Sequence, residues 1–504
     1  MVYSLKEKRK NIGLFLINTV IIFCVFSLFV FSKHYSSDDF FCYYDQMGEA
    51  NAVIFSSYRI CLGVIYIILS YLKINVVTYQ ILFGVLMLIC FSASVTLITI
   101  TINNIISIQE GTITDFSLLA INIGSLMLII NVFISEWVWF SLGYIQWGLS
   151  VLFSTLAAVY LIRNEIKDYV LTFFFLILAA GCYQISISIY VFVVMLFIIC
   201  NEKGKISKRA IKYTVKAAIP AILSILGNML CTKLLVAFGV GYSGSRADFG
   251  IQQILEKLCM LLKNEKVLWN TGLGLLPKYF MCIICGAYIF LLIYLIITGR
   301  FKWNILSVLV TLLAGIAVMC MPVVLQESFY QPARMIVPIT GVFMVLHIVI
   351  IVGMRNEKRV LQCAVVIGIV YLGVNIVEIQ RNTVDCIKTC ALEKKETEDI
   401  VKYIQNYEIE NNCIVENIAF LPDEHPVYKY TNEIANWGYG GEMASRSILV
   451  DWSNIQLFNF YSGNNYNKSF DNVKAYVSEE KNYEYFSPNE QIYIENGTAY
   501  IYIY

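Results

Sequence analysis

Residues 12 to 32 read IGLFLINTVIIFCVFSLFVFS, an apolar run of about twenty residues, the length that an α-helix needs to cross a bilayer core. Four basic residues precede the run: Lys6, Lys8, Arg9 and Lys10. The run ends in Lys33 and His34 rather than at a small-residue cleavage site, so it predicts a retained membrane span. Because basic flanks stay in the cytoplasm, we expect the N-terminus there.

The composition of the whole chain agrees with this start. Of 504 residues, 58% are apolar and 14% charged, and the mean hydropathy is +0.67. Soluble proteins carry about 45–50% apolar and about 25% charged residues, so the chain is predicted to be an integral membrane protein. The balance of 37 Lys and Arg against 36 Asp and Glu argues against a nucleic-acid partner, which needs a basic excess. Most of the 15 Cys lie in apolar runs and are expected to be free thiols.

Further apolar runs follow the first and define the predicted fold class. They fall at about 58–73, 77–101, 117–134, 143–162, 169–182, 184–200, 213–238, 279–298, 303–322, 335–353 and 359–378. Together with the first run they make twelve candidate spans, so the sequence predicts a polytopic α-helical membrane protein.

Basic stretches at 203–216, 300–302 and 355–359 predict three cytoplasmic loops. With a cytoplasmic N-terminus, the number of crossings before residue 203 must be even, yet seven runs lie there. One run is therefore re-entrant or one is missed, and the break at 181–184 and the aromatic segment 136–147 are the suspected places. The total becomes 11 or 13 transmembrane helices.

This topology predicts four segments on the outer side: 33–57, 239–278, 323–334 and everything after about 381. The second segment repeats Ile and Leu at helical spacing between 251 and 262, with polar residues opposite. Such a stripe is typical of an interfacial helix on the outer leaflet.

The composition changes near residue 381, which divides the chain into a transmembrane core (1–380) and an extracytoplasmic soluble α/β domain (381–504). The elements expected in the second part are a helix over 392–408, strands over 413–420 and 447–459, and a hairpin over 491–504 around Asn496 and Gly497.

The first outer loop contains the most informative sequence, SSDDFFCYYDQMGE at 36–49. Either Ser36 or Ser37 can cap a helix whose first turn holds Asp38 and Asp39, where the helix dipole favours negative charge.

Within that loop, Asp38, Asp45 and Glu49 would share one helix face at the boundary between membrane and water. Carboxylates there can deprotonate a hydroxyl or hold a cation. The alternative is a solvated acidic loop without chemistry.

Arg59 and Arg334 each stand at the outer start of a predicted span. A cation at that depth needs a partner, either a loop carboxylate or a phosphate, so the two predict a phosphate clamp. Structural arginines that reach to the interface are the alternative. Arg246 and Lys278 are weaker outer candidates, and Tyr183 with Gln184 can line a polar cavity or pack between helices.

These motifs, in their order along the chain, resemble the GT-C membrane glycosyltransferases and, within them, the serotype-converting O-antigen glucosyltransferase family. The resemblance covers about residues 1–380. The matching pieces are Ser37-Asp38-Asp39, Ser57-Tyr58-Arg59, Ser135-Glu136-Trp137 to Tyr144-Ile145-Gln146, Gly181-Cys182-Tyr183-Gln184 and Ala333-Arg334. The chain departs from the family in having Tyr58 before Arg59, where Gly is commoner, and in its longer tail.

The resemblance implies an inverting glycosyltransferase in the bacterial cytoplasmic membrane. Its donor would be a hexose, glucose by analogy, on undecaprenyl phosphate, and its acceptor an envelope glycan such as O-antigen, capsule or a teichoic-type polymer. Asp38 or Asp39 would be the base, and Arg59 and Arg334 would bind the donor phosphate.

The same resemblance leaves several points open. Accessory roles would fall to Asp45, Glu49, Tyr183, Gln184, Arg246 and Lys278. A divalent cation, a partner flippase and a carrier-charging enzyme are open requirements. The alternatives are a polysaccharide polymerase and a lipid-linked glycan transporter, although a transporter would place charges at mid-membrane, whereas here nearly all lie at span ends.

Overall fold

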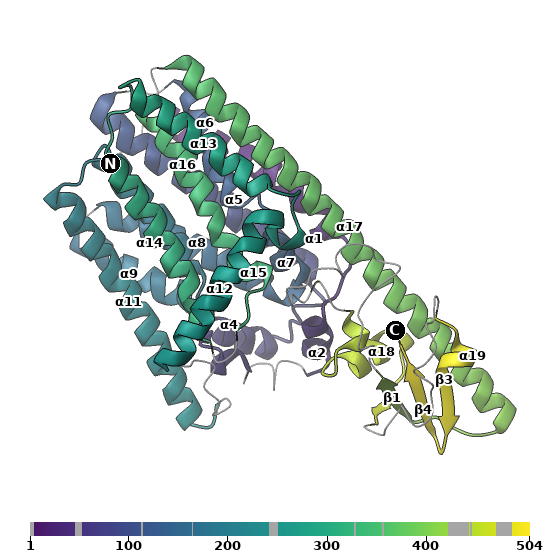
Figure 1. The fold of residues 1–504 in the computed structure, drawn as a ribbon. Helices are drawn as coiled ribbons and strands as arrows, with labels where there is room; N and C mark the ends of the chain where they lie inside the picture. Colours follow the sequence, from purple (N-terminus) through teal and green to yellow (C-terminus); the bar gives the residue numbers. More distant parts are fainter. Residues whose placement is uncertain are drawn as a thin grey trace.

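The computed structural model describes residues 5–45, 53–111, 114–163, 165–240, 250–326, 329–354, 357–421, 443, 446–469 and 486–503. Within these ranges the protein is a bundle of long helices, with a small sheet beyond one end of it (Figure 1).

Eight described helical segments are long and apolar enough to cross a membrane. They involve α1 (Leu5–Phe31), α5 (Gln80–Glu110), α8 (Tyr144–Arg163), α11 (Lys208–Ala237), α13 (Phe280–Ile297), α14 (Ile305–Val324), α15 (Ala333–Ile336) continued by η3 (Val337–Thr340) and α16 (Gly341–Gly353), and α17 (Lys358–Asn411). The shorter ones are α4 (Ile60–Tyr71), α6 (Asp115–Met127), α9 (Ile166–Cys182) and α10 (Ser186–Asn201). Every predicted apolar run falls on one of these helices, so the prediction of a membrane-embedded helical protein is confirmed.

The first two long helices run in opposite directions. Gly84, near the start of α5, lies against Val30 at the end of α1. Further along, the amide of Asn18 donates to Thr96 Oγ1 at 2.9 Å. The end of α1 thus contacts the start of α5, and an earlier part of α1 contacts a later part of α5. The two helices are therefore antiparallel.

The short helix α4 lies between these two in sequence but does not run the length of the bundle. The hydroxyl of Tyr66 donates to the carbonyl of Leu142, and Asn75, just after α4, donates to the carbonyl of Tyr43 at 3.5 Å. The middle of α4 and the chain just after it therefore lie at the end of the bundle where α1 finishes. The run at 58–73 is therefore confined to that end of the bundle.

The opposite end of the bundle gathers the basic stretches, and we call it the basic end. Lys10 pairs with Asp115 at 2.8 Å, and Arg300 pairs with Glu357 at 3.3 Å. The carbonyl of Gly204 accepts from Asn304 N at 3.1 Å. The start of the N-terminal helix and all three basic loops thus share one end. The other end carries α2 (Ser37–Asp45) and is called the α2 end (Figure 1).

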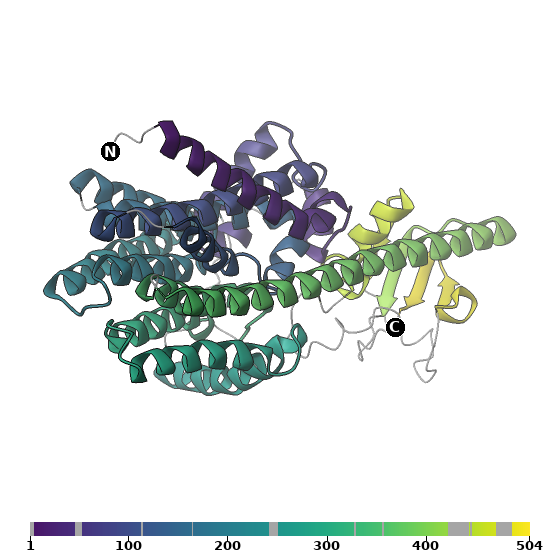
Figure 2. The ribbon, with the colours of Figure 1, turned by 90° about the horizontal axis from the view of Figure 1, so that it is seen from above.

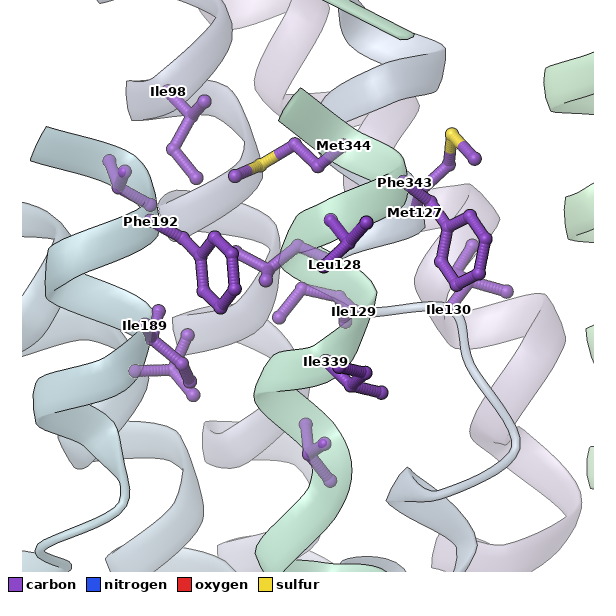
Figure 3. Packing of buried hydrophobic residues seen from close by; sticks show 14 of the residues in the cluster. Ile98, Met127, Leu128, Ile129, Ile130, Ile189, Phe192, Ile339, Phe343 and Met344 are labelled. Carbon is purple, nitrogen blue, oxygen red and sulfur yellow. The ribbon is translucent and has the colours of Figure 1, made fainter. Parts of the chain in front are cut away.

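The core of the bundle surrounds the α15–α16 segment, which is buried along its length. Figure 3 shows Phe192 of α10 among Ile189, Leu128 and Met344. The Phe192 ring fills the space above Gly341 of α16 and Gly315 of α14, where any Cβ would lie within 2.5 Å of it. This close packing fixes the start of α16 against α10 and α14.

The last helix, α17, is continuous from Lys358 to Asn411 and extends from the bundle to the sheet (Figure 2). The predicted boundary at 381 lies inside it, and the helix predicted over 392–408 is its final part. The sequence contains neither Gly nor Pro between 374 and 411, so nothing interrupts the helix where the composition changes. One stripe of the helix stays buried at helical spacing, from Ile379 through Ile400 to Ile404.

The sheet is formed by β1 (Asn417–Leu421), β2 (Asn467–Lys468), β3 (Ile492–Glu495) and β4 (Thr498–Tyr502) in the order β2-β1-β4-β3. β1 pairs in parallel with both β2 and β4, and β3 with β4 antiparallel. The predicted hairpin is confirmed. Asn496 and Gly497 have φ of 50° and 73°, the positive values that a tight two-residue hairpin turn requires.

The strand predicted over 447–459 is wrong. The chain there forms η6 (Ser447–Leu449) and α18 (Asn454–Ser462). Ile455 and Phe458 are buried three residues apart, which is helical spacing, whereas a strand would bury alternate residues. The apolar content of the segment indicated burial, but the spacing of its buried residues decides between a helix and a strand.

The predicted interfacial segment 239–278 contains α12 (Ile251–Thr271), so its helix is confirmed. Leu261 and Leu268 pack into the bundle, while Ile251 and Leu262 stay exposed. Residues 241–249 lie outside the described ranges. The remaining short elements are α7 (Ile134–Trp139), η1 (Ser141–Gly143), η2 (Gly272–Gly274) and α19 (Pro488–Gln491).

Candidate active site

The two adjacent aspartates of α2 have different surroundings. Ser36 N and Ser36 Oγ both donate to Asp39 Oδ2 at 2.8 Å, and Asp39 N donates back to Ser36 Oγ at 3.3 Å. This reciprocal arrangement is a capping box that starts the helix. Ser141 Oγ and Leu142 N donate to Asp39 Oδ1 at 2.9 and 2.8 Å. Asp39 is fully buried, and its hydrogen bonds from Ser141 and Leu142 fix α2 to η1.

Asp38 is half-buried and faces the other way, toward two cations. Burial raises the pKa of Asp38 above its usual value, and the nearby Arg334 and Arg59 oppose that rise. Its carboxylate also accepts a side-chain hydrogen bond from Trp452. Of the two predicted bases, Asp38 is the one whose carboxylate faces the arginines.

Arg334 is held in place by a carboxylate from another helix. Its Nη1 and its backbone N donate to the two oxygens of Glu136, each at 2.6 Å, and its Nη2 donates to the Tyr330 hydroxyl at 2.9 Å. Glu136 is fully buried, so its charge depends on this pairing. Trp137 Nε1 donates to the Arg334 carbonyl at 2.9 Å and fixes the start of α15 further.

Sequence reasoning did not include Glu136 among the site residues, although a signal was present. Between Asp115 and Arg163 it is the one charged side chain in the sequence. A carboxylate inside such an apolar stretch is costly unless a cation meets it, which predicts a partner such as Arg334.

Tyr183 joins the two arginines, and Gln184 fixes the loop before one of them. The Arg59 guanidinium lies 5.2 Å from the centroid of the Tyr183 ring, and Tyr183 also has a side-chain hydrogen bond with Arg334. Gln184 Nε2 donates to the carbonyls of Ser57 and Tyr58 at 2.7 and 2.9 Å. The break after α9, where a cavity-lining role was predicted, thus positions the segment that leads into Arg59.

Two indole rings pack against Tyr183. Trp147 meets it edge to face at 4.7 Å between centroids, and Trp137 stacks on Trp147 at 5.0 Å. Rigid aromatic packing of this kind keeps Tyr183 in one orientation between the two cations.

Three of the other predicted residues cannot be placed against this site, and Lys278 lies apart from it. Asp45 is the last residue of α2, and Glu49 and Arg246 lie outside the described ranges. Lys278 is exposed before α13, with its ammonium 5.0 Å from the centroid of the Tyr279 ring. Within the part of the chain that the structure describes, no group of three His, Cys, Asp or Glu side chains could hold a metal ion.

The five side chains that meet at the α2 end, Asp38, Arg59, Glu136, Tyr183 and Arg334, are called the Asp38 cluster. It presents a half-buried carboxylate beside two guanidinium groups, one of them fixed by Glu136. Such a set can accept a proton from a hydroxyl and hold an anionic group a short distance away.

The chain was compared with family models, with curated proteins and with solved structures, and none of them matches it. The functional argument therefore stands on the residues and geometry of this chain.

Proposed function

We propose that the protein is a membrane glycosyltransferase that moves a hexose from a polyprenyl phosphate donor to an envelope glycan. The observation that carries the proposal is the Asp38 carboxylate facing Arg59 and Arg334. A polyprenyl phosphate sugar has an anionic leaving group at head-group level, and its transfer needs a base near the acceptor hydroxyl. The Asp38 cluster supplies both kinds of group at one end of an apolar bundle.

In the proposed reaction, Asp38 takes the proton of an acceptor hydroxyl. The hydroxyl oxygen then bonds to the anomeric carbon of the donor sugar while the bond from that carbon to the phosphate oxygen breaks. Polyprenyl phosphate leaves with the electron pair, and Arg59 and Arg334 stabilise its charge. Because the acceptor enters opposite the leaving group, the anomeric centre inverts.

The proposal places the α2 end outside the bacterial cytoplasmic membrane and the basic end inside, by the positive-inside rule. With α4 confined to the α2 end, the count of crossings before residue 203 becomes even, as the topology requires. Eleven segments then cross: α1, α5, α6 with the residues that follow it, α8, α9, α10, α11, α13, α14, α15–α16 and α17. The sheet lies on the outer side, where the acceptor glycan is found. A flippase and an enzyme that charges the carrier would supply the donor.

The test compares envelope polysaccharide from cells that lack the protein, cells with the wild type and cells with Asp38→Asn. Mass and linkage analysis should find a hexose branch in the wild type alone. Membranes with the wild type should also consume undecaprenyl phosphate hexose only when that polysaccharide is added. Identical polysaccharide in all three strains, with the wild type inserted at normal levels, would refute the proposal.

A further inference from the structure

Trp452 connects the C-terminal segment to the Asp38 cluster. Its side chain hydrogen bonds to the Asp38 carboxylate, yet 52% of its surface is exposed. Tryptophan is highly buried on average, so a half-exposed indole beside a half-buried carboxylate needs an explanation. A ring left open at the mouth of a site can serve as a contact surface for a ligand.

One anchor fixes the chain just before Trp452 to α17. Arg446 is buried and pairs with Glu396, and Ile448 N donates to Glu393 Oε1 at 3.1 Å. Ser453 Oγ then donates to the Ser447 carbonyl at 2.8 Å and closes the turn that presents Trp452.

A second anchor fixes the chain just after it to α2. Phe460 of α18 meets Tyr35 and Phe40 edge to face, with centroids 4.9 and 5.5 Å apart, and Tyr461 meets Phe40 at 5.6 Å. α2 carries Asp38, so this packing holds the segment with Trp452 next to the helix with Asp38 (Figure 1 shows α18 beside α2). Trp452 is therefore held in place on both sides, and its ring is exposed in that fixed position.

We propose that Trp452 is the platform for the acceptor sugar, the pyranose unit whose hydroxyl is glycosylated. The C–H faces of a pyranose ring are apolar and stack on aromatic rings, while its hydroxyls stay free at the edge. The acceptor hydroxyl must reach Asp38, and Trp452 is an exposed ring that hydrogen bonds to Asp38. The donor is assigned to the other side of the same carboxylate, where Arg59 and Arg334 would hold its phosphate.

The indole N–H has a second role in this arrangement. Its hydrogen bond favours the charged form of Asp38 and so lowers its pKa, against the effect of burial. Two substitutions separate the role of the ring from the role of the N–H group. Trp452→Phe keeps an aromatic face and removes the hydrogen-bond donor, whereas Trp452→Ala removes both.

The inference rests on the proposed function, and its test separates the two. The probe is lipid-free envelope polysaccharide from cells that lack the protein. Its binding to the purified full-length protein is measured without donor, and transfer is measured with undecaprenyl phosphate hexose. The variants are Trp452→Ala and Trp452→Phe. The matched control is Tyr493→Ala, which removes another half-exposed ring from β3 in the same region.

Trp452→Ala should weaken polysaccharide binding and raise the acceptor KM about tenfold, with the donor KM unchanged. Trp452→Phe should keep acceptor affinity within about twofold while the acid limb of its pH profile moves to higher pH. Tyr493→Ala should change neither.

Unchanged binding in Trp452→Ala, in a preparation where the wild type transfers hexose, would overturn the acceptor platform and leave the proposed function standing. Binding that depends on Trp452 without transfer by the wild type would keep the platform and refute the transferase. A wild type that neither binds nor transfers would refute both.

Discussion

At the scale of single residues, the two aspartates should respond differently to the same substitution. Asp38→Asn removes the proposed base without touching a packed group, so transfer should fall about 10²- to 10⁴-fold with little change in melting temperature. Asp39→Asn turns one acceptor of two hydrogen bonds into a donor that faces other donors, at a cost of about 1–3 kcal/mol. Donor-dependent transfer and melting temperature, measured on both proteins, check this pair. Full activity in Asp38→Asn would show that Asp38 is not the base.

The pH dependence of transfer should report the same carboxylate. Burial raises the pKa of Asp38 above that of an ordinary aspartate, and a base works only in its deprotonated form. Transfer should therefore be lost as pH falls through this raised pKa, at a higher pH than a solvent-exposed aspartate would give. A kcat/KM profile of the wild type measures the acid limb. An acid limb at or below the usual aspartate value would contradict the assignment.

The two arginines should respond differently to substitution, because Arg334 pairs with the buried carboxylate of Glu136. Glu136→Gln deprives Arg334 of its buried partner, and breaking such a pair costs about 3–5 kcal/mol, which should appear as a large drop in melting temperature. Arg59→Lys keeps the charge and loses the paired donors, so the donor KM should rise while the melting temperature changes little. Donor titrations with thermal melts on both variants test this. A lowered melting temperature with unchanged donor KM in Arg59→Lys would make Arg59 structural.

Sequence reasoning identified Asp38, Asp39, Arg59, Tyr183 and Arg334 because each stands where an apolar run begins or ends, and charges and polar groups are expected there. It could not choose between the aspartates, since that choice depends on contacts with residues a hundred positions away, at Ser141 and Leu142. It also missed two partners supplied by distant segments, Glu136 and Trp452. The functional roles of all these residues stay predictions.

At the scale of elements, α4 gives a sharp test of the fold. Lys73, directly after α4, should lie at the α2 end, although the run at 58–73 was counted as a candidate span. In intact cells, Lys73→Cys should therefore react with a membrane-impermeant maleimide. Lys205→Cys at the basic end is the matched control and should react only after permeabilisation, and the wild type gives the background from native thiols. Equal behaviour of the two variants would contradict the placement of α4.

The elements themselves were largely predictable, because hydrophobic period and length decide helices in an apolar chain. Three features were not. The position of α4 at one end of the bundle depends on contacts of Tyr66 and Asn75 with other segments of the chain. The continuity of α17 was hidden by the change in composition near residue 381, which also brings Glu393 and Glu396 onto its buried face. The segment at 447–459 was read as a strand from its apolar content, without regard to the spacing of Ile455 and Phe458.

At the scale of the whole molecule, the arrangement of the two ends determines where chemistry can occur. In the proposed reaction, lipid-linked sugar and acceptor glycan meet at the Asp38 cluster, which requires the α2 end to be on the outer side of the membrane. All three basic loops and the start of the N-terminal helix lie at the opposite end, so a single orientation satisfies every one of them. The orientation that places the Asp38 cluster outside therefore leaves every basic loop on the cytoplasmic side, as the positive-inside rule expects.

Reporter fusions at three positions should establish this orientation. Fusions after residues 205 and 357 should show activity of a reporter that works in the cytoplasm, because both positions lie at the basic end. A fusion after Gly463, the residue that ends α18, should show activity of a reporter that works only outside, because an odd number of crossings separates it from the N-terminus. Cytoplasmic activity at 463 together with cytoplasmic activity at 205 would change the number of crossings. Reversed activity at all three positions would invert the bundle, place the Asp38 cluster in the cytoplasm and exclude transfer to an outer envelope glycan.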